Sequence, residues 1–75
     1  MVKVLLTIKI IGIMSYNSGD KYDGEWKLNR KCGYGIGNYA NGDIYNGEWD
    51  NNMKNGSGMF YVNGRCYKVF QWWTV

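Results

Sequence analysis

Three groups of residues in this sequence have the types and spacing that chemistry requires. Closely spaced glycines, as in GYGIG at residues 33–37, form loops that bind phosphate groups. The glutamates Glu25 and Glu48 occupy equivalent places in two similar segments, and a pair of carboxylates can act as general acid and base. Cys32 and Cys66 carry thiols, which serve as nucleophiles or metal ligands once ionised. The sequence around each group decides whether it performs this chemistry in this protein.

The glycine run lacks the context of a phosphate loop. Such a loop needs a helix N-terminus behind it, whose N–H groups point at the anion. The residues that follow are NYANG, which cannot open a helix, and no Lys-Ser or Lys-Thr pair comes after the run. The glycine spacing is also not that of a dinucleotide fingerprint. We therefore expect no nucleotide cofactor at residues 33–37.

The glutamates and cysteines lack catalytic partners. The chain has no histidine, which removes the commonest general base and the commonest metal ligand. Equivalent positions two strands apart are separated by about 10 Å, so we interpret Glu25 and Glu48 as part of a solvated strand face. Two cysteines are too few for a four-thiolate zinc site, and we interpret them as free thiols of a reducing cytosol. We expect no catalytic residue, no cofactor and no metal.

Length and charge set further bounds. With 75 residues the chain is at most one domain. Its net charge of +3 is mild and its basic residues are spread out, which disfavours nucleic acid as a partner. The opening MVKVLLTIKIIGIM is shorter than a bilayer span of about 20 residues. Its apolar residues alternate with polar ones, so it predicts a structural first β-strand, with a signal anchor as the alternative.

A shift of 23 residues aligns the sequence with itself, and YDGEWK then falls on YNGEWD. A fixed period in the twenties indicates a stacked array of one small unit. The recurring glycines therefore serve the geometry of each unit and not a single ligand site. The structural positions of the repeat are Tyr22, Gly24, Trp26, Gly33, Gly35, Gly42, Tyr45, Gly47, Trp49, Gly56, Gly58 and Gly64.

Each unit has the pattern of β-hairpins. Residues at i, i+2 and i+4 share one face of a strand, so the Tyr and Trp of each motif lie together and are interpreted as core. Asn29 and Asn52 tolerate the left-handed conformation of a tight turn, and Asn-Gly pairs mark further hairpins. We predict an all-β fold, one antiparallel β-meander of six to seven strands without helix.

Residues 12–67 resemble tandem MORN (membrane occupation and recognition nexus) repeats, whose pattern is Y-x-G-x-W, then G-x-G, then a glycine before the next Tyr. The sequence departs from this pattern at Val69 and Gln71, which fall where the Gly and Trp of a third motif are expected, and in a second copy one residue shorter. The predicted organisation is an N-terminal strand or cap at 1–11, a half repeat at 12–21, repeats at 22–44 and 45–66, and a divergent C-terminal strand or cap at 67–75.

The resemblance implies a single-layer, twisted sheet of stacked hairpins with an aromatic-lined concave face, and roles in scaffolding, membrane tethering and phosphoinositide contact. We expect a non-enzymatic scaffold that binds another protein or a second copy of itself. The first alternative is peripheral binding to anionic membranes, and the second is an aromatic platform for single-stranded nucleic acid or sugar. The expected location is the cytoplasm, or the cytoplasmic face of a membrane in the lipid-binding case.

Candidate contact residues lie at the end of the chain and beside the first tight turn. The C-terminal residues are apolar, and two consecutive tryptophans in a strand point to opposite faces, so one of them needs a partner. The basic residues of the turn are candidates for anionic lipid. The candidates are Val69, Phe70, Trp72 and Trp73 for a partner protein, and Lys27, Arg30 and Lys31 for lipid.

Overall fold

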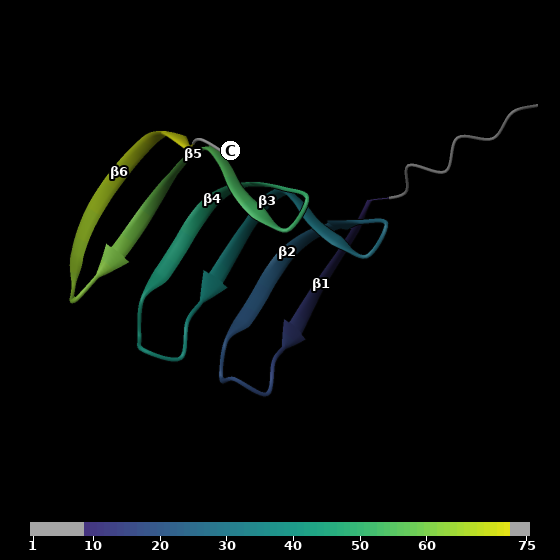
Figure 1. Ribbon diagram of the computed structural model, residues 1–75, viewed down its shortest axis with the longest axis horizontal. Helices are drawn as coiled ribbons and strands as arrows, with labels where there is room; N and C mark the ends of the chain where they lie inside the picture. Colours follow the sequence, from purple (N-terminus) through teal and green to yellow (C-terminus); the bar gives the residue numbers. More distant parts are fainter. Residues whose placement is uncertain (1–8, 73–75) are drawn as a thin grey trace, which may run out of the picture.

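The computed structural model describes residues 9–72, which form one open antiparallel sheet of six strands in chain order (Figure 1). The predicted β-meander is confirmed, with no helix among these residues. Residues 1–8 and 73–75 lie outside the described part, and so does most of the predicted N-terminal strand. The strands are β1 (Ile10–Ser15), β2 (Lys21–Lys27), β3 (Arg30–Asn38), β4 (Ile44–Asp50), β5 (Met53–Val62) and β6 (Arg65–Trp72).

The connections are hairpins of two kinds. The tight ones have two central residues with positive φ, which matches the right-handed twist of the flanking strands. At the β2–β3 turn these residues are Leu28 (φ 52°) and Asn29 (φ 62°), and the equivalent β4–β5 turn uses Asn51 and Asn52. The sequence pattern predicted that β3 and β5 begin at their Gly-x-Gly motifs. Both strands begin three residues earlier.

The other kind of connection is a longer loop. In the β3–β4 loop the N–H of Tyr39 donates to the carbonyl of Asp43 at 2.9 Å. Tyr16 and Asp20 make the same bond between β1 and β2, at 2.9 Å. Both loops lie at the same end of the strands (Figure 1).

The register places two strand types in alternation. Strands β2 and β4 carry Tyr-x-Gly-x-Trp, and strands β3 and β5 carry Gly-x-Gly. Strand β1 is of the second type, because Gly12 pairs with Gly24 as Gly35 pairs with Gly47. We call the side of the sheet that carries the Tyr and Trp side chains the aromatic face, and the reverse side the outer face.

A bulge in β6 corrects one expectation from the sequence. Gln71 was placed at the position of a repeat tryptophan, but β6 contains one extra residue between Val69, opposite Gly58, and Trp72, opposite Gly56. Trp72 thus takes the place in the register that Trp49 takes opposite Gly33. Val69 does occupy the glycine position, as predicted from the sequence.

Candidate interaction surface

The aromatic face is built by tyrosine rings that lie across glycines. A Cβ atom on Gly35 would overlap the ring of Tyr22, and one on Gly58 would overlap the ring of Tyr45. Each phenol hydroxyl donates to a carbonyl of its own strand, at 3.0 Å from Tyr22 to Glu25 and at 3.0 Å from Tyr45 to Glu48. Tyr22 is 1% exposed and Tyr45 is 0% exposed. The repeat glycines therefore make room for tyrosines, as their recurrence in the sequence suggested.

The tryptophans join these tyrosines into one row. The indole of Trp26 donates to the Gly12 carbonyl at 3.1 Å, and that of Trp49 donates to the Gly35 carbonyl at 3.0 Å. Edge-to-face contacts link Tyr22 with Trp26 at 4.9 Å, Tyr22 with Trp49 at 5.1 Å, and Tyr45 with Trp49 at 5.2 Å between ring centroids. Such geometry brings the positive edge of one ring to the negative face of the next. The row is the core of this single-layer sheet.

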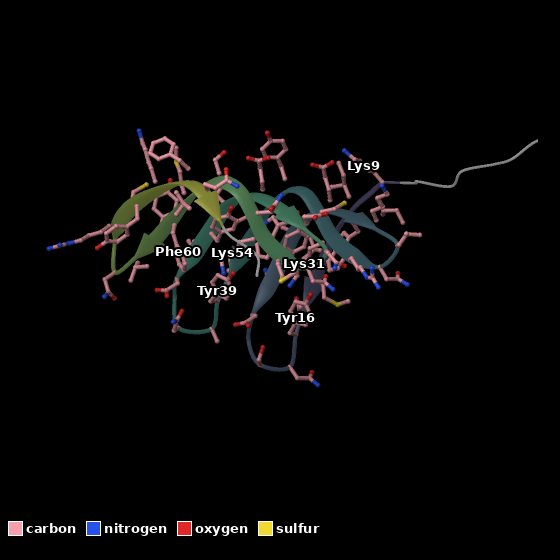
Figure 2. The ribbon with its side chains drawn as sticks, turned by 45° about the horizontal axis from the view of Figure 1, so that its top comes forward. Lys9, Tyr16, Lys31, Tyr39, Lys54 and Phe60 are labelled. Atoms are coloured by element: carbon pink, nitrogen blue, oxygen red, sulfur yellow. The ribbon has the colours of Figure 1, made fainter. Side chains whose placement is uncertain are left out.

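Two lysines cover the row at the same 23-residue period. The ammonium of Lys31 lies 5.0 Å from the ring centroid of Tyr16, 5.5 Å from Tyr22 and 5.3 Å from Trp49. Lys54 lies above the next set of rings, including Trp49 at 5.8 Å. Figure 2 shows both lysines with Tyr16, Tyr39 and Phe60 on one side of the ribbon, and Lys9 on the other.

The lysine contacts and the burial of the tyrosines limit which ligands the aromatic face can bind. A cation above an aromatic ring is stabilised by the ring quadrupole. Because Tyr22 and Tyr45 are buried, their rings offer no surface on which a base or sugar could stack. Burial, followed by the charges of Cys32 and Glu25, raises the pKa of Tyr22 to about 12. Its phenol is therefore neutral at ordinary pH and not a nucleophile.

The motif glutamates have a structural task that the sequence interpretation missed. Glu25 accepts a hydrogen bond from the backbone N–H of Tyr34 at 2.6 Å. Glu48 accepts from the N–H of Ser57 at 2.9 Å and from its hydroxyl at 2.8 Å. Both carboxylates sit beside a bulge where a glycine has positive φ, so a side chain at Gly33 would meet the Glu25 carboxylate. The sequence signal for this task is the interval of eight residues between Glu and Gly, which recurs in both repeats.

These hydrogen bonds stabilise the charged carboxylates. The N–H of Tyr34 and then the ammonium of Lys9, 3.3 Å away, lower the pKa of Glu25. The N–H and hydroxyl of Ser57 lower the pKa of Glu48. The interpretation of these glutamates as part of a solvated strand face is therefore incomplete. They hold the bulge of the neighbouring strand.

Within residues 9–72 no cluster of three or more His, Cys, Asp or Glu side chains is placed to bind a metal ion. Cys32 and Cys66 are free thiols there, half-buried and exposed respectively. The same residues contain no helix long and apolar enough to cross a bilayer.

The outer face carries a row of apolar side chains. Ile13, Ile36 and Met59 follow one another at 23-residue intervals and are 66%, 37% and 41% exposed. Cross-strand pairing places them in one lateral line across all six strands. The line runs Ile13, Asp23, Ile36, Asn46, Met59, Lys68. We call Ile13, Ile36 and Met59 the apolar row.

Further apolar side chains extend this surface. Ile11 and Tyr34 lie beside the row on β1 and β3 and are largely exposed. Phe70 on β6 is 79% exposed and, with Tyr34, Met59 and Lys68, lines a hollow of about 400 Å³. The row was not predicted from the sequence, because the period was assigned to the tyrosines, tryptophans and glycines only. The signal was a second apolar series at the same period.

The predicted contact residues are dispersed in the structure. Lys27 and Arg30 flank the β2–β3 turn, whereas Lys31 lies on the aromatic face, so the three do not form one basic patch. Of the C-terminal candidates, Phe70 is exposed and Val69 is half-buried. The Trp73 candidate lies outside the described residues.

Comparison with known families decides the identity of this fold. The model of the MORN repeat matches residues 22–44 and 45–64, which together are more than half of the chain. The chain belongs to the MORN repeat family. The first matched MORN repeat corresponds to the β2–β3 hairpin and the β3–β4 loop. The second corresponds to the β4–β5 hairpin. MORN repeats are non-catalytic modules of protein interaction or membrane association. A search of curated proteins found no match to the chain.

Proposed function

We propose that this MORN protein is a non-enzymatic interaction module whose outer face docks onto another folded protein. The apolar row carries the proposal. A single-layer sheet can bury one face only, and here the tyrosines, tryptophans and lysines of the aromatic face pack on one another, apart from the hollow at its N-terminal edge. Three apolar side chains alternate with Asp23 and Asn46 on the remaining face, and exposed apolar side chains gathered in this way are costly to leave in water and mark interaction sites.

A second copy of the chain is the simplest partner. In a two-fold face-to-face dimer with its axis at Ile36, Ile36 meets Ile36 of the second copy. The same axis sets Ile13 against Met59 of the second copy, because the two residues lie equally far along the row on either side of Ile36. Asp23 then faces Asn46 of the second copy. Along this row, apolar residues meet apolar residues and polar residues meet polar residues.

Sedimentation velocity over a concentration series tests this proposal. The wild-type protein is expected to associate as concentration rises, and Ile36→Lys to remain monomeric, because the substitution places two ammonium groups at the dimer axis. Leu28→Lys is the matched control, since it adds the same charge at an exposed apolar residue of the β2–β3 turn. Near-UV circular dichroism checks that both variants fold. A wild-type protein that stays monomeric, or an Ile36→Lys variant that associates like wild type, would contradict the proposal.

The β2–β3 turn favours a second candidate function, contact with an anionic membrane surface. Leu28 is 71% exposed at the tip of this turn, between Lys27 and Arg30. An apolar tip with basic flanks combines insertion at the headgroup level with attraction to anionic lipid, at about 1 kcal/mol per basic residue. This mode would place the protein at the cytoplasmic face of a membrane.

Vesicle flotation separates this candidate from the first. Binding is expected to phosphatidylserine-containing vesicles and not to phosphatidylcholine alone, and to be lost in 1 M salt, where the Debye length falls to about 3 Å. Leu28→Asp should weaken it, while Ile36→Lys should not. Equal binding to both vesicle types would exclude the electrostatic mode.

A further inference from the structure

Gly12 on β1 is the first member of a glycine series whose other members are Gly35 and Gly58. At Gly35 and Gly58 the tyrosine of the preceding strand lies across the glycine. Gly12 has no such neighbour among residues 9–72, since a Cβ placed there would meet only the Trp26 indole, at 3.8 and 3.9 Å. The same site thus occurs three times in the sheet, twice filled by a tyrosine ring and once without one.

The space above Gly12 is a hollow of about 320 Å³ at the N-terminal edge of the sheet. Its lining includes Ile10, Gly12, Met14 and Trp26. Within the described part of the chain, Trp26 packs edge-to-face on one tyrosine, Tyr22. Its equivalent Trp49 packs on two tyrosines and is buried, whereas Trp26 is half-buried. The ring that Trp26 lacks is the one that would stand over Gly12.

The edge of β1 supplies the backbone for such an occupant. In the described sheet β1 pairs with β2 alone, so its other side presents N–H and C=O groups for an added strand. A strand aligned there as β2 is aligned on β3 would set a glycine opposite Gly12, as Gly24 is opposite Gly35. Its tyrosine, two residues earlier, would then lean over Gly12.

We propose that the β1 edge, with its hollow at Gly12, binds an extended Tyr-x-Gly segment of another protein as an additional antiparallel strand. The tyrosine ring fills the hollow against Trp26. The glycine two residues later is required because the strands approach closely there: at the equivalent place a Cβ on Gly47 would lie 2.5 Å from the Cα of Gly58. The hollow lies at the β1 edge and its lining includes Ile13 of the apolar row, but the proposal does not depend on the proposed function.

The strand β6 of a second copy does not fit this site. Val69 stands at the glycine position of β6, opposite Gly58 as Gly47 is opposite Gly35. Its branched side chain would meet the backbone at Gly12 where only a glycine can approach. End-to-end stacking of copies through β6 is therefore blocked, and we assign the occupant to a different protein.

Titration of the full chain with a synthetic peptide tests the proposal. The probe is DIYNGEWDN, the sequence of residues 43–51, because it forms the corresponding strand inside the protein. Saturable binding is expected, with a shift of the Trp26 indole N–H signal in NMR spectra and little change at Trp49. Peptides with Tyr45→Ala or Gly47→Val should bind at least tenfold more weakly.

The matched protein variant is Gly12→Ala, whose added methyl occupies the hollow without touching backbone. It is expected to keep the wild-type melting temperature and to bind the probe at least tenfold more weakly. Ile36→Lys should bind the probe normally, and Gly12→Ala should sediment like wild type, which separates this proposal from the proposed function. Absence of peptide binding, or equal binding of the probe and the Gly47→Val peptide, would overturn it.

Discussion

At the residue scale, the aromatic face depends on the absence of a methyl group at particular glycines. The sequence predicted this arrangement, because the glycines recur with the tyrosines and tryptophans at one period. It did not predict the task of Glu25 and Glu48. Their hydrogen bonds depend on a bulge that exposes the N–H groups of Tyr34 and Ser57 on the neighbouring strand, and bulges leave little trace in a pattern of period two.

One substitution should have unequal effects on stability at two equivalent glycines. Gly35→Ala places a methyl group in the ring of Tyr22 and is expected to cost about 2–3 kcal/mol of unfolding free energy. Gly12→Ala meets only the Trp26 indole at van der Waals distance and should change stability by less than about 1 kcal/mol. Urea unfolding followed by far-UV circular dichroism measures both. Equal costs at the two positions would show that the tyrosine-on-glycine contact does not matter.

Acid should remove the contribution of the Glu48 carboxylate. Because the folded-state pKa lies below the ordinary value of 4.5, the carboxylate stabilises the fold above about that pH, and the effect is lost as pH falls through the folded pKa. Glu48→Gln is expected to lower the melting temperature at pH 7 and to flatten its decline between about pH 5 and pH 3. Asp50→Asn, at the exposed end of the same strand, is the control. A Glu48→Gln curve parallel to that of wild type would contradict this role.

At the scale of elements, the hairpins follow from the sequence and the end strands do not. Alternating residues and Asn-containing turns predicted the meander, and Asn29 and Asn52 do adopt positive φ. The bulge in β6 was not predictable, because the count from Tyr67 gives no sign of an extra residue before Trp72. The lysines above the rings were also missed. Their register positions opposite Trp26 and Trp49 become visible only once the two-residue turns are known.

The two repeat tryptophans should contribute unequally. Trp49 lies between two tyrosines and donates a buried hydrogen bond, so Trp49→Ala is expected to cost about 3–5 kcal/mol of unfolding free energy. Trp49→Phe should cost about 1–3 kcal/mol, since the Gly35 carbonyl loses its donor. Trp26→Ala, beside the open hollow at Gly12, should cost less than Trp49→Ala. Chemical denaturation of the three variants gives the order, and an equal loss for both alanine variants would refute it.

At the scale of the whole molecule, one layer of strands leaves the outer face and both edges without a second layer. The hairpin signals predicted the meander, and the resemblance to MORN repeats implied its single layer. The sequence predicted the contact surface at the C-terminal segment. Only the cross-strand register showed that Ile13, Ile36 and Met59 form a row. The aromatic face between Tyr22 and Phe60 therefore forms the core, and the outer face is the proposed docking surface.

The most direct measurement of that assignment is a dilution series of NMR spectra of the wild-type protein. Methyl signals of Ile13, Ile36 and Met59 report on the apolar row, and the indole N–H signals of Trp26 and Trp49 report on the aromatic face. With increasing concentration the methyl signals are expected to shift together along one saturation curve, while the indole signals stay in place. Indole shifts with unchanged methyl signals, or no shift in either group, would contradict the account.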